Sequence, residues 1–280
     1  MNLVEYHDLL LRCAGQLPDE LVYAARTWLA GQADPTDDPL PWYAMSPLGP
    51  DELAGYPGEV PACLDLTGTG QLPDPVDATA VGAVADRIPA IGLWRAWRYP
   101  AGRADRRAPK RVYLVQVGAN EAAAWPGWTD RIQRALLAGG EPDPQVEVFT
   151  DPGRLPAYQR TALACGALLW TAREARPVRV AAVFDAPDHP VLAGARRDAV
   201  LRYLTAGTPL VAGPGGARTD GVWVWPEAVC HHLAEHGRRP DLELLDHIQE
   251  RGYSVPPVDV VDLHRALAAL NPAAVGTVKH

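Results

Sequence analysis

The sequence predicts a mixed α/β protein with a central sheet of about five strands flanked by helices, a helical N-terminus and a helical C-terminal tail. Three observations support this fold class. Segments with strand-like alternation of apolar and polar residues alternate along the chain with segments of helical apolar spacing. Glycine or proline stands at most junctions, where these residues end or begin elements. The chain has 280 residues, of which 48% are hydrophobic, and this is enough for a sizeable core.

The N-terminal part predicts two helices followed by an irregular arm. Pro18 suits the opening of a second helix, and Asp19 favours the dipole at that end. Residues 31–89 are rich in proline, glycine and aspartate, which disfavour regular structure. We therefore expect a helical head and a Pro/Gly/Asp-rich arm over residues 1–90, and an α/β domain with a helical tail over residues 91–280.

A strand hairpin and a helix–strand pair are expected next. Residues 91–99 and 111–117 are rich in β-branched and aromatic residues and predict two strands joined by a long polar loop. A helix is expected over residues 128–138, since two glycines follow it, and then a short strand over residues 145–150.

The remaining chain predicts one long buried helix, one buried strand and then mainly helices. Residues 156–173 favour the long helix, and residues 178–185 form the most apolar strand, which we expect at the centre of the sheet. A short strand over residues 222–225 interrupts a series of helices bounded by proline and glycine, expected at residues 195–207, 226–237, 240–252 and 259–270.

The residue types exclude several chemistries. The two lysines, Lys110 and Lys279, do not follow a glycine-rich loop, so the chain has no P-loop. The two serines, Ser46 and Ser254, lack the flanking glycines of a nucleophile elbow. The four cysteines form no Cys-x-x-Cys pair, which excludes a zinc ribbon, and Cys165 is expected to be a buried, unreactive thiol.

The charge distribution indicates the kind of partner. Residues 1–100 carry 14 acidic and 5 basic side chains, whereas the whole chain has a net charge of −8. An acidic head opposes nucleic-acid binding and favours a basic protein partner. No apolar run approaches the ~20 residues that cross a bilayer, and the N-terminus lacks the positive charge of a secretory signal. We expect a cytosolic bacterial protein without a membrane partner; its Ala, Gly, Pro and Arg bias is typical of GC-rich, actinobacterial genomes.

One motif supports a metal-dependent alternative. His232 and His236 belong to a His-x-x-Glu-His pattern, so their rings share one helix face, and Glu235 is placed to act as a general base. Such a site needs a third ligand, but little chain remains to build the second helix that such proteases use. The carboxylates available as that ligand are Asp241, Glu243, Asp246, Glu250, Asp259 and Asp262. Histidine near a helix C-terminus also stabilises the helix dipole without a metal. We therefore predict no metal or cofactor, with zinc as the alternative.

Two further clusters are candidate interaction residues. Arg218 and Asp220 belong to an Arg-Thr-Asp-Gly turn that directly precedes a predicted strand. On that strand Trp223 and Trp225 share one face. The turn has a structural interpretation as well as a binding one, and tryptophans in this pattern are usually part of the core. The second cluster, Asp185, Asp188 and His189, follows the predicted central strand, where α/β proteins place ligand sites, although an Asp/Pro-rich turn explains it equally.

The segment RTDGVWVWPEAVCHHLAEHG, followed by PDLELLDHIQERGY, resembles a module found in bacterial immunity-like and toxin-associated proteins. The resemblance covers about residues 195–255 and carries over no catalytic residue. It implies a protein that binds a single partner, such as a toxin that it neutralises. The sequence therefore favours a non-enzymatic interaction module that binds a basic partner. The alternative is a zinc-dependent hydrolase that uses His232, Glu235 and His236.

Overall fold

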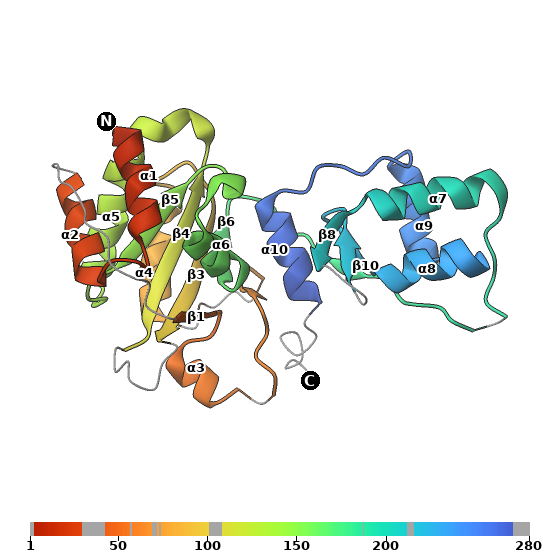
Figure 1. Cartoon of the computed structure of the whole chain (residues 1–280), viewed down its shortest axis with the longest axis horizontal. Coiled ribbons are helices and arrows are strands. Elements are labelled where there is room, and N and C mark those ends of the chain that lie inside the picture. Colours follow the sequence, from red (N-terminus) through yellow and green to blue (C-terminus); the bar gives the residue numbers. More distant parts are fainter. Residues whose placement is uncertain are drawn as a thin grey trace. The chain divides into compact units, whose positions relative to one another are not determined.

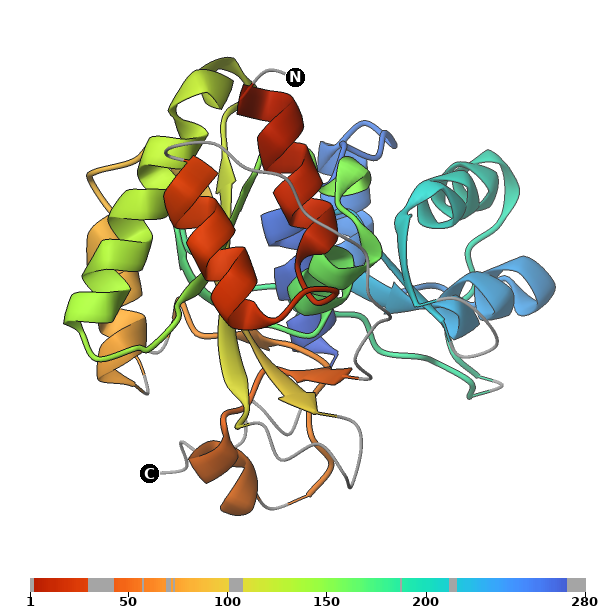
Figure 2. The same cartoon turned by 60° about the vertical axis from the view of Figure 1, so that its left-hand side comes forward.

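The computed structural model divides into two compact units, an N-terminal unit (Met1–Ala175) and a C-terminal unit (Arg176–His280). Figures 1 and 2 show the elements of both. The predicted α/β class is confirmed. The structure describes residues 3–29, 43–56, 58–68, 72, 74–100, 108–186, 188–211 and 216–270.

The N-terminal unit contains a mixed six-stranded sheet in the order β2-β6-β3-β4-β5, with β1 paired to the far end of β3. β3 and β4 form the predicted antiparallel hairpin, and β5 adds to β4 in parallel. The strands are β1 (Tyr43–Ser46), β2 (Leu64–Asp65), β3 (Ala90–Pro100), β4 (Lys110–Val117), β5 (Gln145–Phe149) and β6 (Ala167–Thr171).

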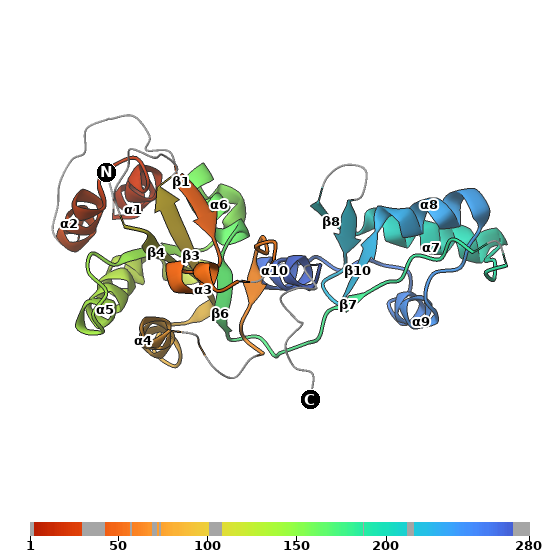
Figure 3. The same ribbon diagram turned by 90° about the horizontal axis from the view of Figure 1, so that it is seen from below.

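Helices cover both faces of this sheet, as Figure 3 shows from below. One face carries α1 (Leu3–Cys13), α2 (Asp19–Leu29) and α6 (Ala157–Ala164), and the other carries α4 (Pro75–Val84) and α5 (Trp125–Ala138). The two helices predicted at the N-terminus and the helix predicted over residues 128–138 are therefore confirmed. The short elements are α3 (Pro50–Ala54) and the 3-10 turns η1 (Ala119–Ala124) and η2 (Pro152–Arg154).

Charged side chains lie inside this unit because each has a partner. Arg95 on β3 is 1% exposed, and its guanidinium donates to Asp77 on α4 at 2.8 Å and to the carbonyl of Pro47 at 2.6 Å. Tyr113 donates to the other oxygen of Asp77 at 2.8 Å. A buried charge without such partners would be costly, so the three side chains form one structural group.

The prediction of an irregular arm over residues 31–89 was wrong in part, because its described residues include β1, α3, β2 and α4. α4 begins at Pro75, where Asp74 caps the helix by accepting from the amide of Val76 at 2.7 Å. Proline here starts a helix rather than preventing one. Residues 31–42, 57, 69–71 and 73 of the arm lie outside the described residues.

The predicted division at residue 90 does not coincide with the boundary between the units. β1 pairs with β3 and β2 pairs with β6, so strands from the first ninety residues belong to the same sheet as strands that follow. The boundary falls after Ala175.

The single long helix predicted over residues 156–173 was wrong. α6 ends at Ala164, and β6 begins at Ala167 and pairs with β2 and β3. The apolar run fits a buried strand as well as a helix, and the sheet decides between them. Cys165, at the end of α6, is half-buried rather than fully buried, and burial raises the pKa of its thiol.

The C-terminal unit has a four-stranded sheet in the order β7-β10-β9-β8 with helices around it. The helices predicted in this region are confirmed, and α8 ends where Gly237 adopts a φ of +66°. The elements are β7 (Arg179–Val180), α7 (Gly194–Ala206), β8 (Thr208–Val211), β9 (Ala217–Thr219), β10 (Trp223–Pro226), α8 (Glu227–His236), α9 (Leu242–Glu250) and α10 (Val260–Ala269).

The long central strand predicted over residues 178–185 was also wrong. β7 has only two residues, both exposed, and lies at the edge of the small sheet. Beyond it the amide of Ala182 donates to the carboxylate of Asp241 at 2.7 Å, so the chain leaves the sheet. None of the described helices is long and apolar enough to cross a membrane.

Candidate functional site

Asp220 joins three elements of the C-terminal unit. Its side chain is fully buried and accepts four hydrogen bonds. One oxygen accepts the amides of Val222 and Trp223 at 2.9 and 2.8 Å; the other accepts the Tyr203 hydroxyl at 2.5 Å and Nε2 of His247 at 2.6 Å. The turn before β10 is thereby tied to α7 and α9.

These donors keep Asp220 ionised. Burial alone would raise the pKa of a carboxyl group, but the hydrogen bonds from Trp223, Tyr203, Val222 and His247 outweigh it and hold the pKa below its ordinary value. Asp220 is therefore a buried anion that fixes the orientation of the His247 ring.

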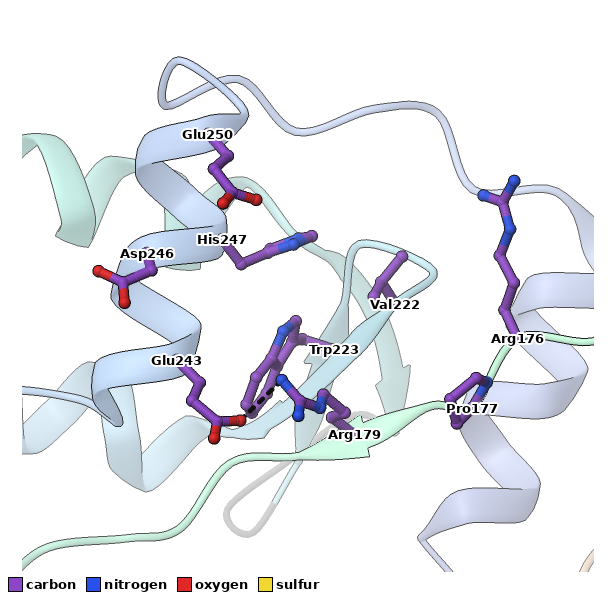
Figure 4. Close-up of a pocket in the computed structure, with 9 residues that line it drawn as sticks. All are labelled: Arg176, Pro177, Arg179, Val222, Trp223, Glu243, Asp246, His247 and Glu250. Atoms are coloured by element: carbon purple, nitrogen blue, oxygen red, sulfur yellow. Dashed lines mark ion pairs between the residues drawn. The ribbon is translucent and has the colours of Figure 1, made fainter.

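His247 lines a pocket of about 510 Å³ between α9, β7 and β10. Figure 4 shows its ring extending from α9 over the indole of Trp223, which forms a wall of the pocket. The side chain of His247 is 14% exposed, so it reaches the pocket while its Nε2 stays bound to Asp220. The other residues around the pocket are Arg176, Pro177, Arg179, Val222, Glu243, Asp246 and Glu250.

The pocket already contains one bound cation, which belongs to the chain. The guanidinium carbon of Arg179 lies 5.2 Å from the ring centroid of Trp223, and its Nη1 lies 2.7 Å from Oε2 of Glu243. These contacts combine a cation–π interaction with an ion pair. The site can therefore accommodate a flat cationic group.

α9 supplies the acidic side of the pocket. Glu243, Asp246 and Glu250 are all exposed, and residues 241–250 contain no lysine or arginine. Figure 4 shows the carboxylates of Glu243 and Glu250 at two ends of the pocket, with His247 between them, while that of Asp246 is directed away from Trp223. Within the described part of the chain, the carboxylate of Glu250 has no ion-pair partner.

Only part of the first predicted cluster contributes to this pocket. Trp223 lines it and Asp220 supports it, as described above. Arg218 instead donates to Glu227 at 2.6 Å and to the carbonyls of Thr205 and Gly207 at 2.9 and 3.0 Å. It therefore closes the C-terminal end of α7.

Trp225 has no exposed surface, and its indole N–H donates to the carbonyl of Leu204 at 3.0 Å. It packs with Tyr203, whose ring centroid lies 6.0 Å away. Trp225 therefore belongs to the core, as tryptophans in this pattern usually do.

The second predicted cluster lies elsewhere. Asp185 and Asp188 are exposed, and neither they nor His189 line the pocket. The ring of His189 stacks on Phe184 with centroids 4.2 Å apart, and its Nε2 donates to the carbonyl of Arg239 at 2.8 Å. His189 thus anchors a loop to the segment after α8, and the central strand that suggested a ligand site here is absent from the described residues.

The His-x-x-Glu-His motif lies at the C-terminal end of α8. The ring centroids of His232 and His236 are 5.9 Å apart, and the Arg238 guanidinium donates to Nδ1 of His232 at 2.8 Å. Partial burial, Arg238 and the neighbouring imidazoles hold the pKa of His232 below its ordinary value, while Glu235 is exposed. Among the residues described, no three His, Cys, Asp or Glu side chains are grouped to hold a metal ion. The zinc alternative remains a prediction.

Sequence reasoning missed His247 and Arg179, and it considered Glu243 and Glu250 only as possible third zinc ligands. Three of them follow from the pattern of α9, since Leu244, Leu245 and Ile248 are buried and the opposite face carries the acidic residues and His247. Arg179 gave no signal, because its role depends on a parallel pairing between β7 and β10 that joins residues far apart in the sequence.

No protein-family model, curated protein or solved structure matches this chain. The resemblance to immunity-like modules accordingly remains a prediction.

Proposed function

We propose that this chain is a non-enzymatic cytosolic interaction module that binds a basic protein partner through the pocket between α9, β7 and β10. The observation that carries the proposal is the combination of an aromatic wall, Trp223, with exposed carboxylates, Glu243 and Glu250, around one pocket. Aromatic rings and carboxylates are the two groups that bind cationic side chains.

The charge of α9 supports a partner that is basic over more than one side chain. Glu243, Asp246 and Glu250 line one side of the pocket along the helix, and residues 241–250 contain four acidic side chains and no lysine or arginine. Complementary charge speeds the encounter of two proteins and excludes partners of the same charge.

The surface also includes apolar side chains that a protein partner would cover. Leu242 is 56% exposed at the start of α9, and Tyr253, just after the helix, is 37% exposed. Interfaces commonly combine such residues with a charged rim. A partner neutralised by this module, as in toxin–immunity pairs, is the class that the resemblance implies.

The test uses the full-length chain and purified partners. Products of neighbouring reading frames and a panel of small basic and acidic proteins are measured for binding by biolayer interferometry at low and moderate salt. We expect a basic protein to bind, with affinity falling as salt rises. The triple variant Glu243→Gln/Asp246→Asn/Glu250→Gln should lose at least tenfold in affinity.

The control variant changes three exposed carboxylates outside the pocket, Asp188→Asn/Asp198→Asn/Glu235→Gln, and alters the net charge by the same amount. Equal losses of affinity in both triple variants would show that binding depends only on the net charge of the chain and not on the pocket. Absence of preference for basic over acidic proteins would contradict the proposed function.

A further inference from the structure

The side chain of Arg179 occupies the position that a partner's cation would take. Its guanidinium lies against Trp223 and Glu243, yet Arg179 is 52% exposed and Glu243 is 66% exposed. Because solvent reaches both groups, their ion pair is weak and can be exchanged. The backbone of Arg179 is fixed, since its amide donates to the carbonyl of Val222 at 3.0 Å. Only the side chain has to move.

We propose that the pocket binds the guanidinium of a partner's arginine side chain, which displaces Arg179 from Trp223 and Glu243. This inference rests on the proposed function and names the chemical group that the pocket recognises. Arg179 then acts as an internal competitor, which keeps the pocket filled until a partner with a suitable arginine binds.

Two features favour arginine over lysine. A guanidinium is planar and stacks on an indole, as Arg179 does on Trp223, whereas an ammonium group is a strongly hydrated point charge. The carboxylates of Glu243 and Glu250 lie at two ends of the pocket, so a group with several donors in one plane can use either end.

The pocket is large enough for the exchange. Its volume of about 510 Å³ exceeds the space that one arginine side chain needs, and the unpaired carboxylate of Glu250 offers a first contact among the residues described. A partner's arginine can therefore enter while Arg179 is still in place and then replace it on Glu243.

The test measures the affinity of the full-length chain for two fluorescent nonapeptides of equal charge, one with arginines and one with lysines, by fluorescence anisotropy. We expect the arginine peptide to bind at least fivefold more tightly. Arg179→Ala, which removes the competitor, should tighten binding of the arginine peptide at least threefold. Glu243→Gln and Glu250→Gln should each weaken it.

Two controls separate competition from net charge. Arg202→Ala removes one positive charge from an exposed position on α7, and Asp198→Asn removes one negative charge from the same helix. Neither should change the affinity by more than about twofold, because screening limits the effect of distant exposed charges.

The displacement of Arg179 is refuted if the arginine peptide binds but Arg179→Ala does not tighten its binding. It is also refuted if Arg179→Ala changes the affinity no more than Arg202→Ala does. The proposed function stands in both cases. If both peptides bind equally, arginine selectivity is refuted. If neither peptide binds and no basic protein binds either, both proposals fail.

Discussion

Nε2 of His247 lies 2.6 Å from a carboxylate oxygen of Asp220, although 27 residues separate the two in the sequence. The same oxygen accepts the hydroxyl of Tyr203 at 2.5 Å. Tyr203 of α7 and His247 of α9 therefore both bind the buried carboxylate of Asp220. Because His247 lines the pocket, the shape of the pocket depends on this arrangement.

Removing the Asp220 carboxylate should destabilise the C-terminal unit. Asp220→Ala leaves four donors without their acceptor, and two of them, the Tyr203 hydroxyl and the Trp223 amide, are in buried hydrogen bonds. We expect a loss of about 2–6 kcal/mol, since each unsatisfied buried group costs roughly 1–3 kcal/mol. Urea unfolding followed by circular dichroism measures the change. Asp198→Asn, at an exposed position, should stay within about 0.5 kcal/mol of the parent. A similarly small effect of Asp220→Ala would contradict the structural role.

The same carboxylate should make stability fall in acid. The pKa of Asp220 is lower in the folded chain than its ordinary value of 3.8, so the unfolded chain binds its proton first as pH decreases. Its stabilising contribution is complete above about pH 5 and is lost as pH falls below 4 and through the folded pKa. Asp220→Asn should therefore be less stable at pH 7 and lose less further stability between pH 5 and pH 3. Parallel pH profiles for the two chains would refute this.

Two glycine substitutions in the N-terminal unit should have opposite signs. A Cβ at Gly166 would lie 2.8 Å from the carbonyl oxygen of Ala162 and 2.9 Å from that of Arg95, so Gly166→Ala should cost about 1–3 kcal/mol. At Gly82, inside α4, the added Cβ would meet no described atom within 4 Å apart from its chain neighbours and the nearby backbone of the helix itself, and Gly82→Ala should stabilise by about 0.5–1 kcal/mol. Thermal unfolding compares the two variants; equal shifts would show that the tight junction between α6 and β6 is not as described.

Metal analysis tests the zinc alternative directly. We expect purified protein, dialysed after incubation with one equivalent of zinc, to retain no stoichiometric metal, and His232→Ala to leave its metal content unchanged. The reason is that His232 accepts from Arg238, which competes with a cation for Nδ1. One retained zinc ion that is lost in His232→Ala would instead support a hydrolase with His232 and His236 as ligands.

Much of the fold could be predicted because local signals agreed with it. Gly237 ends α8 in the left-handed conformation that glycine favours, and the β-branched and aromatic residues around Trp94 and Leu114 are typical of the β3–β4 hairpin that forms. These elements need no information from distant parts of the chain.

The errors arose where distant partners decide the conformation. The run around Leu168 satisfies a helical pattern, but β2 and β3 provide ladder partners for it. The run after Val178 has the pattern of a buried strand, yet among the described residues only β10 pairs with it, and Asp241 accepts the amide of Ala182. Composition over residues 31–89 likewise concealed α4, because Pro75 serves as a helix start.

Only part of the candidate site could be predicted from the sequence. Asp220 and Trp223 were chosen from a turn and a strand pattern, but His247 and Arg179 come from elements that reach the same place only through tertiary packing. No local pattern distinguishes Trp223, which lines the pocket, from Trp225, which is fully buried.

The hydrogen bond from Ala182 to Asp241 has a consequence for self-association. An edge strand with exposed valines, here Val180 followed by Val183, ordinarily invites another chain to extend the sheet, which is the first step toward fibres. A carboxylate already holds the amide that such a chain would need next, and it brings a negative charge to the edge. Replacing Asp241 with alanine would therefore leave an edge strand that is prone to aggregation, even though Asp241 is not among the residues that line the pocket.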